Sequence, residues 1–276
     1  RYAVSAVAGE AVFIKKIKVP VMSEEKLSEK ITQDAEQYIP FDIDDVVLDF
    51  QILDKINANN EETPEDSVNS EESTSTDNSS QRNDEQKKES NEEGEMMEAL
   101  LVAVQRVIID ERTDILLEAG LKPAIIDLDL FALMNAARLT NDLSSMGTIA
   151  LIDLGDSFTH INIIQNGVIG YTRDIPVGGG YLTNMLMSKF KVPFEQVLAI
   201  KRGNFSSDVR EEEVIETIIQ AYKNILEEVQ KYFDYFNTLS NDKIDKILLC
   251  GGGSMIRGLD DYCSDYLKIP AETINP

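Results

Sequence analysis

The amino-acid sequence predicts an α/β fold, in which strand hairpins and amphipathic helices alternate around a sheet. Apolar runs at residues 148–153, 159–165 and 168–174 are separated by tight turns, which is typical of strands. A long segment at residues 211–239 carries apolar residues at helical spacing. The length of 276 residues allows two modest lobes, because single cores stop growing at roughly 250 to 300 residues.

Composition and charge narrow the classes of function. No window approaches the roughly 20 apolar residues that a membrane helix needs. The formal net charge of −24 argues against nonspecific nucleic-acid binding and against direct attraction to anionic lipid. Two cysteines are too few for a disulfide framework, so we expect a reducing cytoplasm. Arg1 opens on strand-like residues without a signal region, and we expect the chain to be a fragment.

Residues 1–121 predict a small module that an acidic insert interrupts. Ser23 begins a helix that ends before Pro40, and strands are expected at residues 2–7, 11–19, 46–53 and 97–104. The insert at residues 54–95 has fourteen acidic and four basic residues, and therefore a net −10. We expect a disordered hairpin tip, because so few apolar groups cannot offset the entropy of ordering. A solvated loop without a dedicated partner is the favoured interpretation of its charge.

The remaining segments extend the alternation of strands and helices. A helix is expected up to Gly120, and residues 122–146 form a connecting strand and helix. Residues 147–276 form the second lobe, with a helical subdomain at about residues 181–243. A strand at residues 246–250 and a helix at residues 259–267 complete it.

A glycine-containing turn, Asp153-Leu-Gly155-Asp156-Ser157-Phe-Thr159, lies between two apolar strands. Gly155 allows backbone amides to approach a phosphate, and the N–H groups and hydroxyl that follow can donate to its oxygens. Asp153, at the strand end, suits a magnesium ion bound through water. By itself, however, the pattern favours a plain structural turn.

Two further glycine sites follow strands. Gly178 and Gly179 lead into a helix whose N-terminus offers free N–H groups, although a flexible cap explains them equally well. The run Gly251, Gly252, Gly253 and Ser254 follows a buried strand, and a planar base could lie against its bare backbone. The three sites in this order together favour a nucleotide site.

These motifs resemble those of the superfamily of actin, the heat-shock chaperone ATPases and the sugar kinases. There an Asp-x-Gly-x-x-x-Thr loop precedes a Gly-Gly turn, and an adenosine motif Gly-Gly-Gly-Ser follows. The resemblance implies actin-like, ribonuclease-H-like lobes with ATP and Mg as cofactors. The string Asp-Ala-Glu-Gln-Tyr-Ile-Pro-Phe at residues 34–41 narrows it, because this string resembles the PilM proteins of type IV pilus assembly.

The PilM resemblance implies similarity to the cell-division protein FtsA, with a subdomain inserted into the first lobe. It implies a cytoplasmic ATP-binding scaffold, peripheral to the inner membrane and associated with it indirectly, among other components of the pilus platform. A cytoplasmic N-terminal peptide of a PilN-like membrane protein would dock between the subdomain and the rest of that lobe. We expect this groove to be lined by the corner Tyr38, Ile39, Pro40 and Phe41, for which a packed helix end is the alternative.

Two features depart from the family pattern. No counterpart of the first phosphate loop is present, and the chain stops short of the helix expected to complete the first lobe. We therefore expect an incomplete first lobe, weak ATP binding and at most a weak ATPase. Asp129 is the nearest match to the acidic residue that positions water, although a helix cap is the favoured interpretation of it. His160, without a partner Cys or a second His to bind a metal, is expected to be structural.

Two other functions remain open at this point. A sugar-kinase-type phosphotransferase would need a catalytic Asp between the lobes, and Asp129 is the best candidate for it. An FtsA-like polymerising protein would need an amphipathic C-terminal membrane helix, which the sequence lacks.

Overall fold

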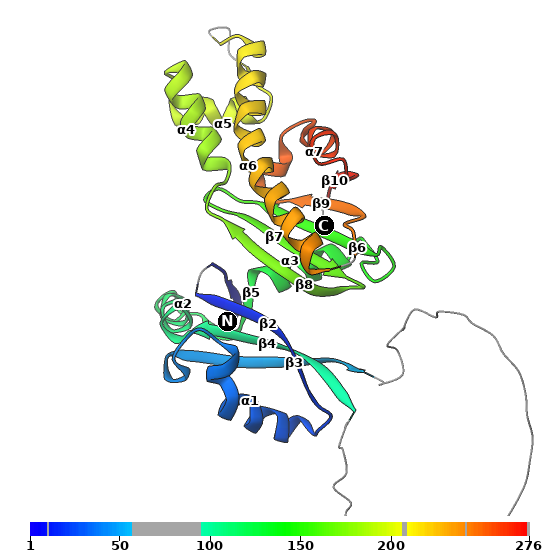
Figure 1. Ribbon diagram of the computed structural model, residues 1–276. Helices are drawn as coiled ribbons and strands as arrows, with labels where there is room; N and C mark the ends of the chain where they lie inside the picture. Colours follow the sequence, from blue (N-terminus) through cyan, green and yellow to red (C-terminus); the bar gives the residue numbers. More distant parts are fainter. Residues whose placement is uncertain (10, 57–94, 206–208, 241, 275–276) are drawn as a thin grey trace, which may run out of the picture.

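The computed structural model describes residues 1–9, 11–56, 95–205, 209–240 and 242–274, and side chains except those of residues 54–56. Its strands form a two-stranded, a three-stranded and a five-stranded sheet within these residues. Figure 1 shows two units, with the five-stranded sheet and its helices above the two smaller sheets. The predicted mixture of strands and helices in an α/β fold is confirmed.

The three-stranded sheet is antiparallel and has the order β2-β4-β3. Helix α1 covers one of its faces, because Leu27, Ile31 and Ala35 recur at helical spacing and are buried against the sheet. Ser23 caps α1 as predicted, with its hydroxyl accepting a hydrogen bond from the Lys26 N–H at 3.5 Å. The elements are β2 (Val12–Pro20), α1 (Glu24–Tyr38), the 3-10 turn η1 (Ile43–Asp45), β3 (Val46–Ile56) and β4 (Met96–Gln105).

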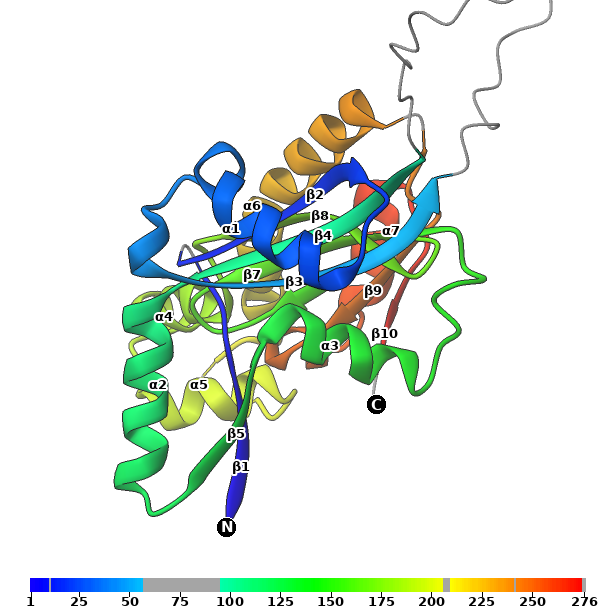
Figure 2. The ribbon, with the colours of Figure 1, turned by 90° about the horizontal axis from the view of Figure 1, so that it is seen from below.

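A separate two-stranded sheet joins the beginning of the chain to its middle. Strand β1 pairs in parallel with β5, and helix α2 connects the three-stranded sheet to β5 (Figure 2). The expected module of residues 1–121 therefore contributes to two sheets, and its limits as a domain stay a prediction. The elements are β1 (Tyr2–Val7), α2 (Arg106–Glu118), β5 (Lys122–Leu128) and α3 (Asp129–Arg138).

The five-stranded sheet has the order β10-β9-β6-β7-β8 and is covered on both faces. Helices α6 and α7 share a core with Ala150 and Ile152 on one face, and α4 and α5 extend that core beyond the sheet. Helix α3 packs on the other face over Ile149 and Leu151. Its strands are β6 (Thr148–Leu154), β7 (Thr159–Gln165), β8 (Val168–Ile175), β9 (Lys246–Cys250) and β10 (Ala271–Thr273). Its helices are α4 (Gly179–Phe190), α5 (Phe194–Lys201), α6 (Glu211–Leu239), the 3-10 turn η2 (Gly252–Met255) and α7 (Leu259–Leu267).

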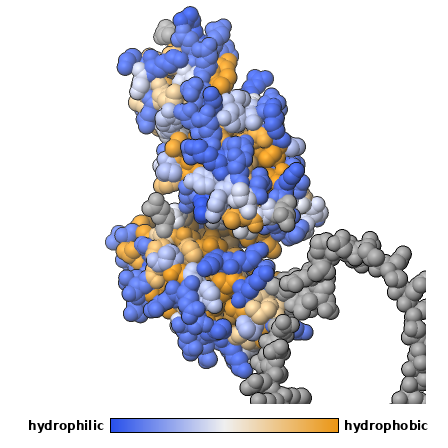
Figure 3. Space-filling view, viewed as in Figure 1, coloured by the Kyte–Doolittle hydropathy of each residue, from blue (hydrophilic) through white to orange (hydrophobic). Residues whose placement is uncertain are grey.

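The outer surface is polar over most of the face shown in Figure 3, and apolar residues gather where the two units meet. Residues 57–94, which make up most of the predicted acidic hairpin tip, lie outside the described residues. No helix in the described part of the chain combines the length and the apolar character needed to cross a bilayer.

Candidate functional site

The three glycine turns predicted from the sequence meet at one edge of the five-stranded sheet. Strands β6 and β9 are parallel neighbours, so the turns that follow them lie at the same edge. Hydrogen bonds join the turn after β6 to the start of α4. The Gly179 N–H donates to the Gly155 carbonyl, and the Gly180 N–H donates to the Asp156 carbonyl, each at 2.8 Å.

Two of the glycines are required by close packing. A Cβ at Gly178 would lie 2.5 Å from the carbonyl oxygens of both Gly155 and Asp156. Gly251 has φ of +79°, and a Cβ there would collide with the Asp153 carboxylate. The backbone can therefore make these turns only without side chains.

The sequence suggested free N–H groups at the start of α4, but those of Gly179 and Gly180 are bonded to the neighbouring turn and hold it in place. The exposed N–H groups of the site belong to other residues. Asp156 and Ser157 are exposed, and their backbone N–H groups have no hydrogen-bond partner within the described residues. A Cβ at Gly252 would meet no atom within 4 Å.

Two predicted hydroxyls also stabilise the turns. The Thr159 hydroxyl is fully buried and donates to the Val177 carbonyl at 2.8 Å. The Ser254 hydroxyl donates to the Gly251 carbonyl at 2.8 Å. Gly253 lies against Leu154 and accepts a hydrogen bond from the Tyr222 hydroxyl at 3.1 Å. These side chains shape the site and leave its open surface to backbone groups.

Lys201 is a residue of this region that sequence analysis missed. Its ammonium group reaches from the end of α5 and donates to the Gly179 carbonyl at 2.7 Å. Burial lowers the pKa of Lys201, and the nearby Asp156 carboxylate opposes that shift. A cation is therefore held beside the turn at Asp156, although no glycine or strand signal marks it in the sequence.

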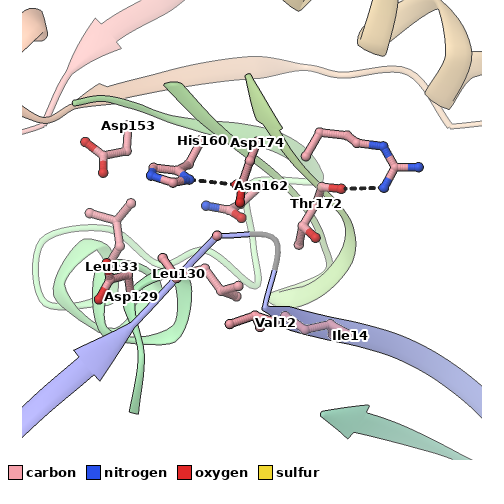
Figure 4. Close-up of a pocket in the computed structure, with 13 residues that line it drawn as sticks. Val12, Ile14, Asp129, Leu130, Leu133, Asp153, His160, Asn162, Thr172 and Asp174 are labelled. Carbon is pink, nitrogen blue, oxygen red and sulfur yellow. Dashed lines mark hydrogen bonds and ion pairs between the residues drawn. The ribbon is translucent and has the colours of Figure 1, made fainter. Parts of the chain in front are cut away.

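A cavity of about 240 Å³ adjoins Asp153 where the two units meet (Figure 4). The turn after β1 and the start of α3 form one side of it, and strands β6, β7 and β8 form the other. His160 lies beside Asp153 in this cavity, and its Nδ1 is 2.6 Å from an Asp174 carboxylate oxygen. The predicted structural role of His160 stays a prediction, but this partner was not expected.

The charges in the cavity influence each other. The hydrogen bond with Asp174 raises the pKa of His160, burial opposes this, and the carboxylates of Asp174, Asp153 and Asp129 support it. Burial raises the pKa of Asp153, which the His160 charge opposes and the Asp129 charge reinforces. An imidazolium at His160 thus offsets part of the negative charge here.

Asp129 lines the same cavity, and the helix-cap interpretation of it is wrong. Leu128 is the N-cap of α3 and no side chain caps the helix, while Asp129 is its first residue. A carboxylate in the first turn interacts favourably with the helix dipole. The Asp129 side chain faces Asp153 across the cavity. Within the described residues no group of three or more His, Cys, Asp or Glu side chains is arranged to hold a metal ion.

The expected partner corner is divided between a core and a hollow. Ile39 is 6% exposed and belongs to the core under α1, and Tyr38 packs partly against that core. Pro40 and Phe41 line a separate hollow between η1 and α2. The acidic residues that line this hollow are Asp42, Asp45, Asp110, Glu111 and Asp114.

Comparison with known proteins gives matches of two kinds. Residues 1–70 and 85–276 match a family model described as type IV pilus assembly protein PilM. Cell division protein FtsA of Buchnera aphidicola is 30% identical over 161 residues, which is 48% of this chain and 38% of that protein. FtsA of Bacillus subtilis is 29% identical over 126 residues, or 45% of this chain and 28% of that protein. The matched part of the chain thus spans well under half of these curated relatives.

A solved structure, of a PilM-PilN type IV pilus biogenesis complex, shares the fold. The likeness covers 100% of this chain and 70% of that chain, with a TM-score of 0.72 and 22% sequence identity.

Proposed function

Because the chain belongs to the PilM family of type IV pilus assembly proteins, we propose that it is a nucleotide-binding scaffold of the pilus assembly platform. It binds ATP at the three glycine turns and holds the cytoplasmic peptide of a PilN-like membrane protein. One observation carries the nucleotide part of the proposal. The backbone N–H groups of Asp156 and Ser157, which have no partner among the described residues, lie at the same sheet edge as the exposed backbone of Gly252.

The donor set fits a nucleotide. Adjacent N–H groups in a tight turn form a concave site that favours phosphate oxygens. The Lys201 ammonium, held at the Gly179 carbonyl, adds positive charge beside that turn. The exposed backbone at Gly252, where a Cβ would meet no protein atom within 4 Å, leaves room for the base. Together these groups would orient the nucleotide along the edge of the sheet.

Asp153 would hold a magnesium ion through water, because Mg²⁺ keeps several waters and prefers oxygen ligands. When bound, the ion would neutralise phosphate charge. Asp129 and the His160–Asp174 pair lie in the adjoining cavity, where they could orient a water molecule. Asp129 is proposed as the residue that would do so in a weak ATPase, and binding alone is sufficient for the scaffold function.

The partner part of the proposal follows from family membership. A PilM protein has been solved in a PilM-PilN complex, and by analogy this chain would bind a PilN-like peptide and be peripheral to the inner membrane. The corner Tyr38, Ile39, Pro40 and Phe41 stays a proposed contact. Since Ile39 is buried, Tyr38, Pro40 and Phe41 are the members of it that a partner can reach, and the last two line the hollow.

Gly252 provides the test of the nucleotide site. Gly252→Ala adds a methyl group where no protein atom lies within 4 Å, so the fold should be unaffected. Isothermal titration with a nonhydrolysable ATP analogue and Mg²⁺ should show measurable, weak binding to the unsubstituted chain. We expect the variant to bind roughly three- to tenfold more weakly, because overpacking by a methyl group costs about 1 kcal/mol.

Val47→Ala, in the other unit, serves as the control and should bind the analogue like the unsubstituted chain. Equal binding by Gly252→Ala and the control would exclude the glycine backbone as the base site. A chain that takes up no analogue at all would refute the nucleotide proposal.

A further inference from the structure

Tyr222 of α6 connects the core beside the five-stranded sheet to the glycine turn that follows β9. Its side chain is 1% exposed, and its hydroxyl donates to the Gly253 carbonyl at 3.1 Å. Burial raises the pKa of this hydroxyl, so it stays protonated and can donate. A buried hydroxyl that lacks an acceptor is costly. The turn is therefore favoured in the position that places the Gly253 carbonyl at the Tyr222 hydroxyl.

Gly253 is enclosed between two parts of the fold. A Cβ there would lie 2.8 Å from the Leu154 Cβ and 2.9 Å from the Tyr222 hydroxyl oxygen. Its neighbour Gly252 has the opposite surroundings, since a Cβ there would meet no atom within 4 Å. The turn thus has an inner side that β6 and α6 fix, and an open side, at Gly252, that the nucleotide proposal assigns to the base.

The backbone bonds within this turn are long. The Ser254 N–H donates to the Gly251 carbonyl at 3.2 Å, and the Ile256 N–H donates to the Gly253 carbonyl at 3.4 Å. Bonds of this kind are typically about 2.9–3.0 Å. The Ser254 hydroxyl makes a shorter bond, at 2.8 Å, but it ends at Gly251 and does not reach Gly253. The Tyr222 hydroxyl therefore adds a hydrogen bond from outside the turn at the carbonyl that the internal bonds hold least.

Helix α6 is also bonded to the helix that holds the other turn. The Asn224 side-chain amide donates to the Tyr181 hydroxyl at 3.1 Å, and the Lys189 ammonium group donates to the Thr217 hydroxyl at 2.9 Å. Tyr181 and Lys189 belong to α4, whose first N–H groups hold the turn after β6. One helix thus links the turn after β9 to the turn after β6.

We propose that Tyr222 is a positioning residue of the nucleotide site, which holds the turn at Gly252 and Gly253 in the place where it can receive the base. The inference rests on the nucleotide binding proposed above and adds a residue, buried behind the turn, on which recognition of the base depends. Without the hydroxyl the turn would take several positions. The apparent affinity would then fall with the fraction of chains in which the turn is in place.

Removal of the single hydroxyl tests this role. Tyr222→Phe keeps the ring in the core and removes the hydrogen bond to Gly253. Tyr232→Phe, ten residues further along α6, is the matched control, because its ring packs against the same core and its hydroxyl has no hydrogen bond within the described residues. Thermal unfolding followed by circular dichroism confirms that each variant is folded.

Isothermal titration with a nonhydrolysable ATP analogue and Mg²⁺ gives the effect on binding. We expect Tyr222→Phe to bind the analogue roughly three- to tenfold more weakly than the unsubstituted chain, the range for the loss of one hydrogen bond. Tyr232→Phe should bind it like the unsubstituted chain.

Hydrogen exchange of the nucleotide-free protein, measured by NMR, locates the effect. The N–H groups of Ser254 and Ile256 should exchange several times faster in Tyr222→Phe, because they close the loosened turn. Those of Gly179 and Gly180 should keep their rates, since they are bonded to the turn after β6. A variant that merely destabilised the fold would raise the rates at both turns.

The contrary outcomes can be told apart. If Tyr222→Phe binds the analogue as tightly as Tyr232→Phe does, Tyr222 does not position the base turn, and the nucleotide proposal stands. If exchange rises equally at both turns, the lost affinity reflects a general loosening, and the positioning role is wrong as well. If the unsubstituted chain takes up no analogue, the nucleotide proposal is refuted, and this inference with it.

Discussion

The five-stranded sheet and the three-stranded sheet differ in how their faces are covered. Helices cover both faces of the larger sheet, and Ile149, Ala150, Leu151 and Ile152 of β6 are at most 1% exposed. The smaller sheet has α1 on one face, while Val47 on the other face is 37% exposed beside a groove.

This difference matches the kind of ligand proposed for each region. A sheet packed on both sides fixes the ends of β6 and β9, and the glycine turns there can be held to the geometry that a small ligand needs. A sheet open on one side leaves apolar surface exposed in the unit that is proposed to hold the partner peptide. Coverage of a sheet thus separates the proposed nucleotide site from the proposed partner site.

The largest expected effect compares one residue of each sheet. Leu151→Ala should lower the free energy of unfolding by about 2–5 kcal/mol, because it leaves a cavity in a core covered on both faces. Val47→Ala should cost less than about 1 kcal/mol, since its side chain already contacts solvent. Urea unfolding followed by circular dichroism measures both. Similar losses from the two variants would show that the open face is covered in solution.

A smaller effect should depend on pH, and it concerns the five-stranded sheet alone because His160 is the single histidine. Asp174 raises the pKa of His160 in the folded state above its ordinary value of 6.5. The stabilisation of the folded state by protonated His160 is complete below the pKa of His160 in the unfolded chain. It is lost as the pH rises through the pKa of His160 in the folded chain. Unfolding curves between pH 5.5 and 8.5 should therefore show stability falling with pH.

The variant His160→Asn should remove this part of the pH dependence, and Asp174→Asn should shift it to lower pH. NMR titration of the single imidazole would give the pKa directly. A folded-state pKa below 6.5 would contradict the ion pair.

The smallest expected effect concerns the cap of α1 on the three-stranded sheet. Ser23→Ala should cost about 0.5 kcal/mol, the low end for an N-cap, because the hydrogen bond to the Lys26 N–H is long at 3.5 Å. Ser28→Ala, inside the same helix, is the control and should be neutral or slightly stabilising. Thermal unfolding of both variants measures the difference, and equal behaviour would show that Ser23 does not cap the helix in solution.

Local signals in the sequence were enough to predict most of the elements. The bounds expected for residues 211–239, 246–250 and 259–267 coincide with α6, β9 and α7. Apolar spacing marks each of these elements, and Gly251 after β9 and Gly258 before α7 mark one end of two of them. The order of the glycine sites along the chain also predicted that they belong together, since turns after neighbouring parallel strands share an edge.

Pairings between distant residues could not be predicted in the same way. The turn at Asn166 and Gly167 would place His160 opposite Arg173 in a regular hairpin, but a bulge between Ile163 and Ile164 shifts the register by one residue. His160 therefore faces Asp174. A single-residue bulge leaves no signal in the apolar pattern, so the charged pair in the cavity is visible in the structure alone.

The parallel pairing of β1 with β5 determines how the smaller sheet is attached to the rest. The chain turns at Gly9 and comes back at the end of β4, where the Gln105 N–H donates to the Ala11 carbonyl at 3.0 Å. The chain therefore enters and leaves the smaller sheet at adjacent points, as in a domain inserted into a host. The inserted sheet closes its own loop, so the entropy of joining β1 to β5 depends little on the number of residues between them. During folding the β2–β4 ladder can form from its own contacts and bring Val7 near Arg106, and the host strands then pair as if they were close neighbours in sequence.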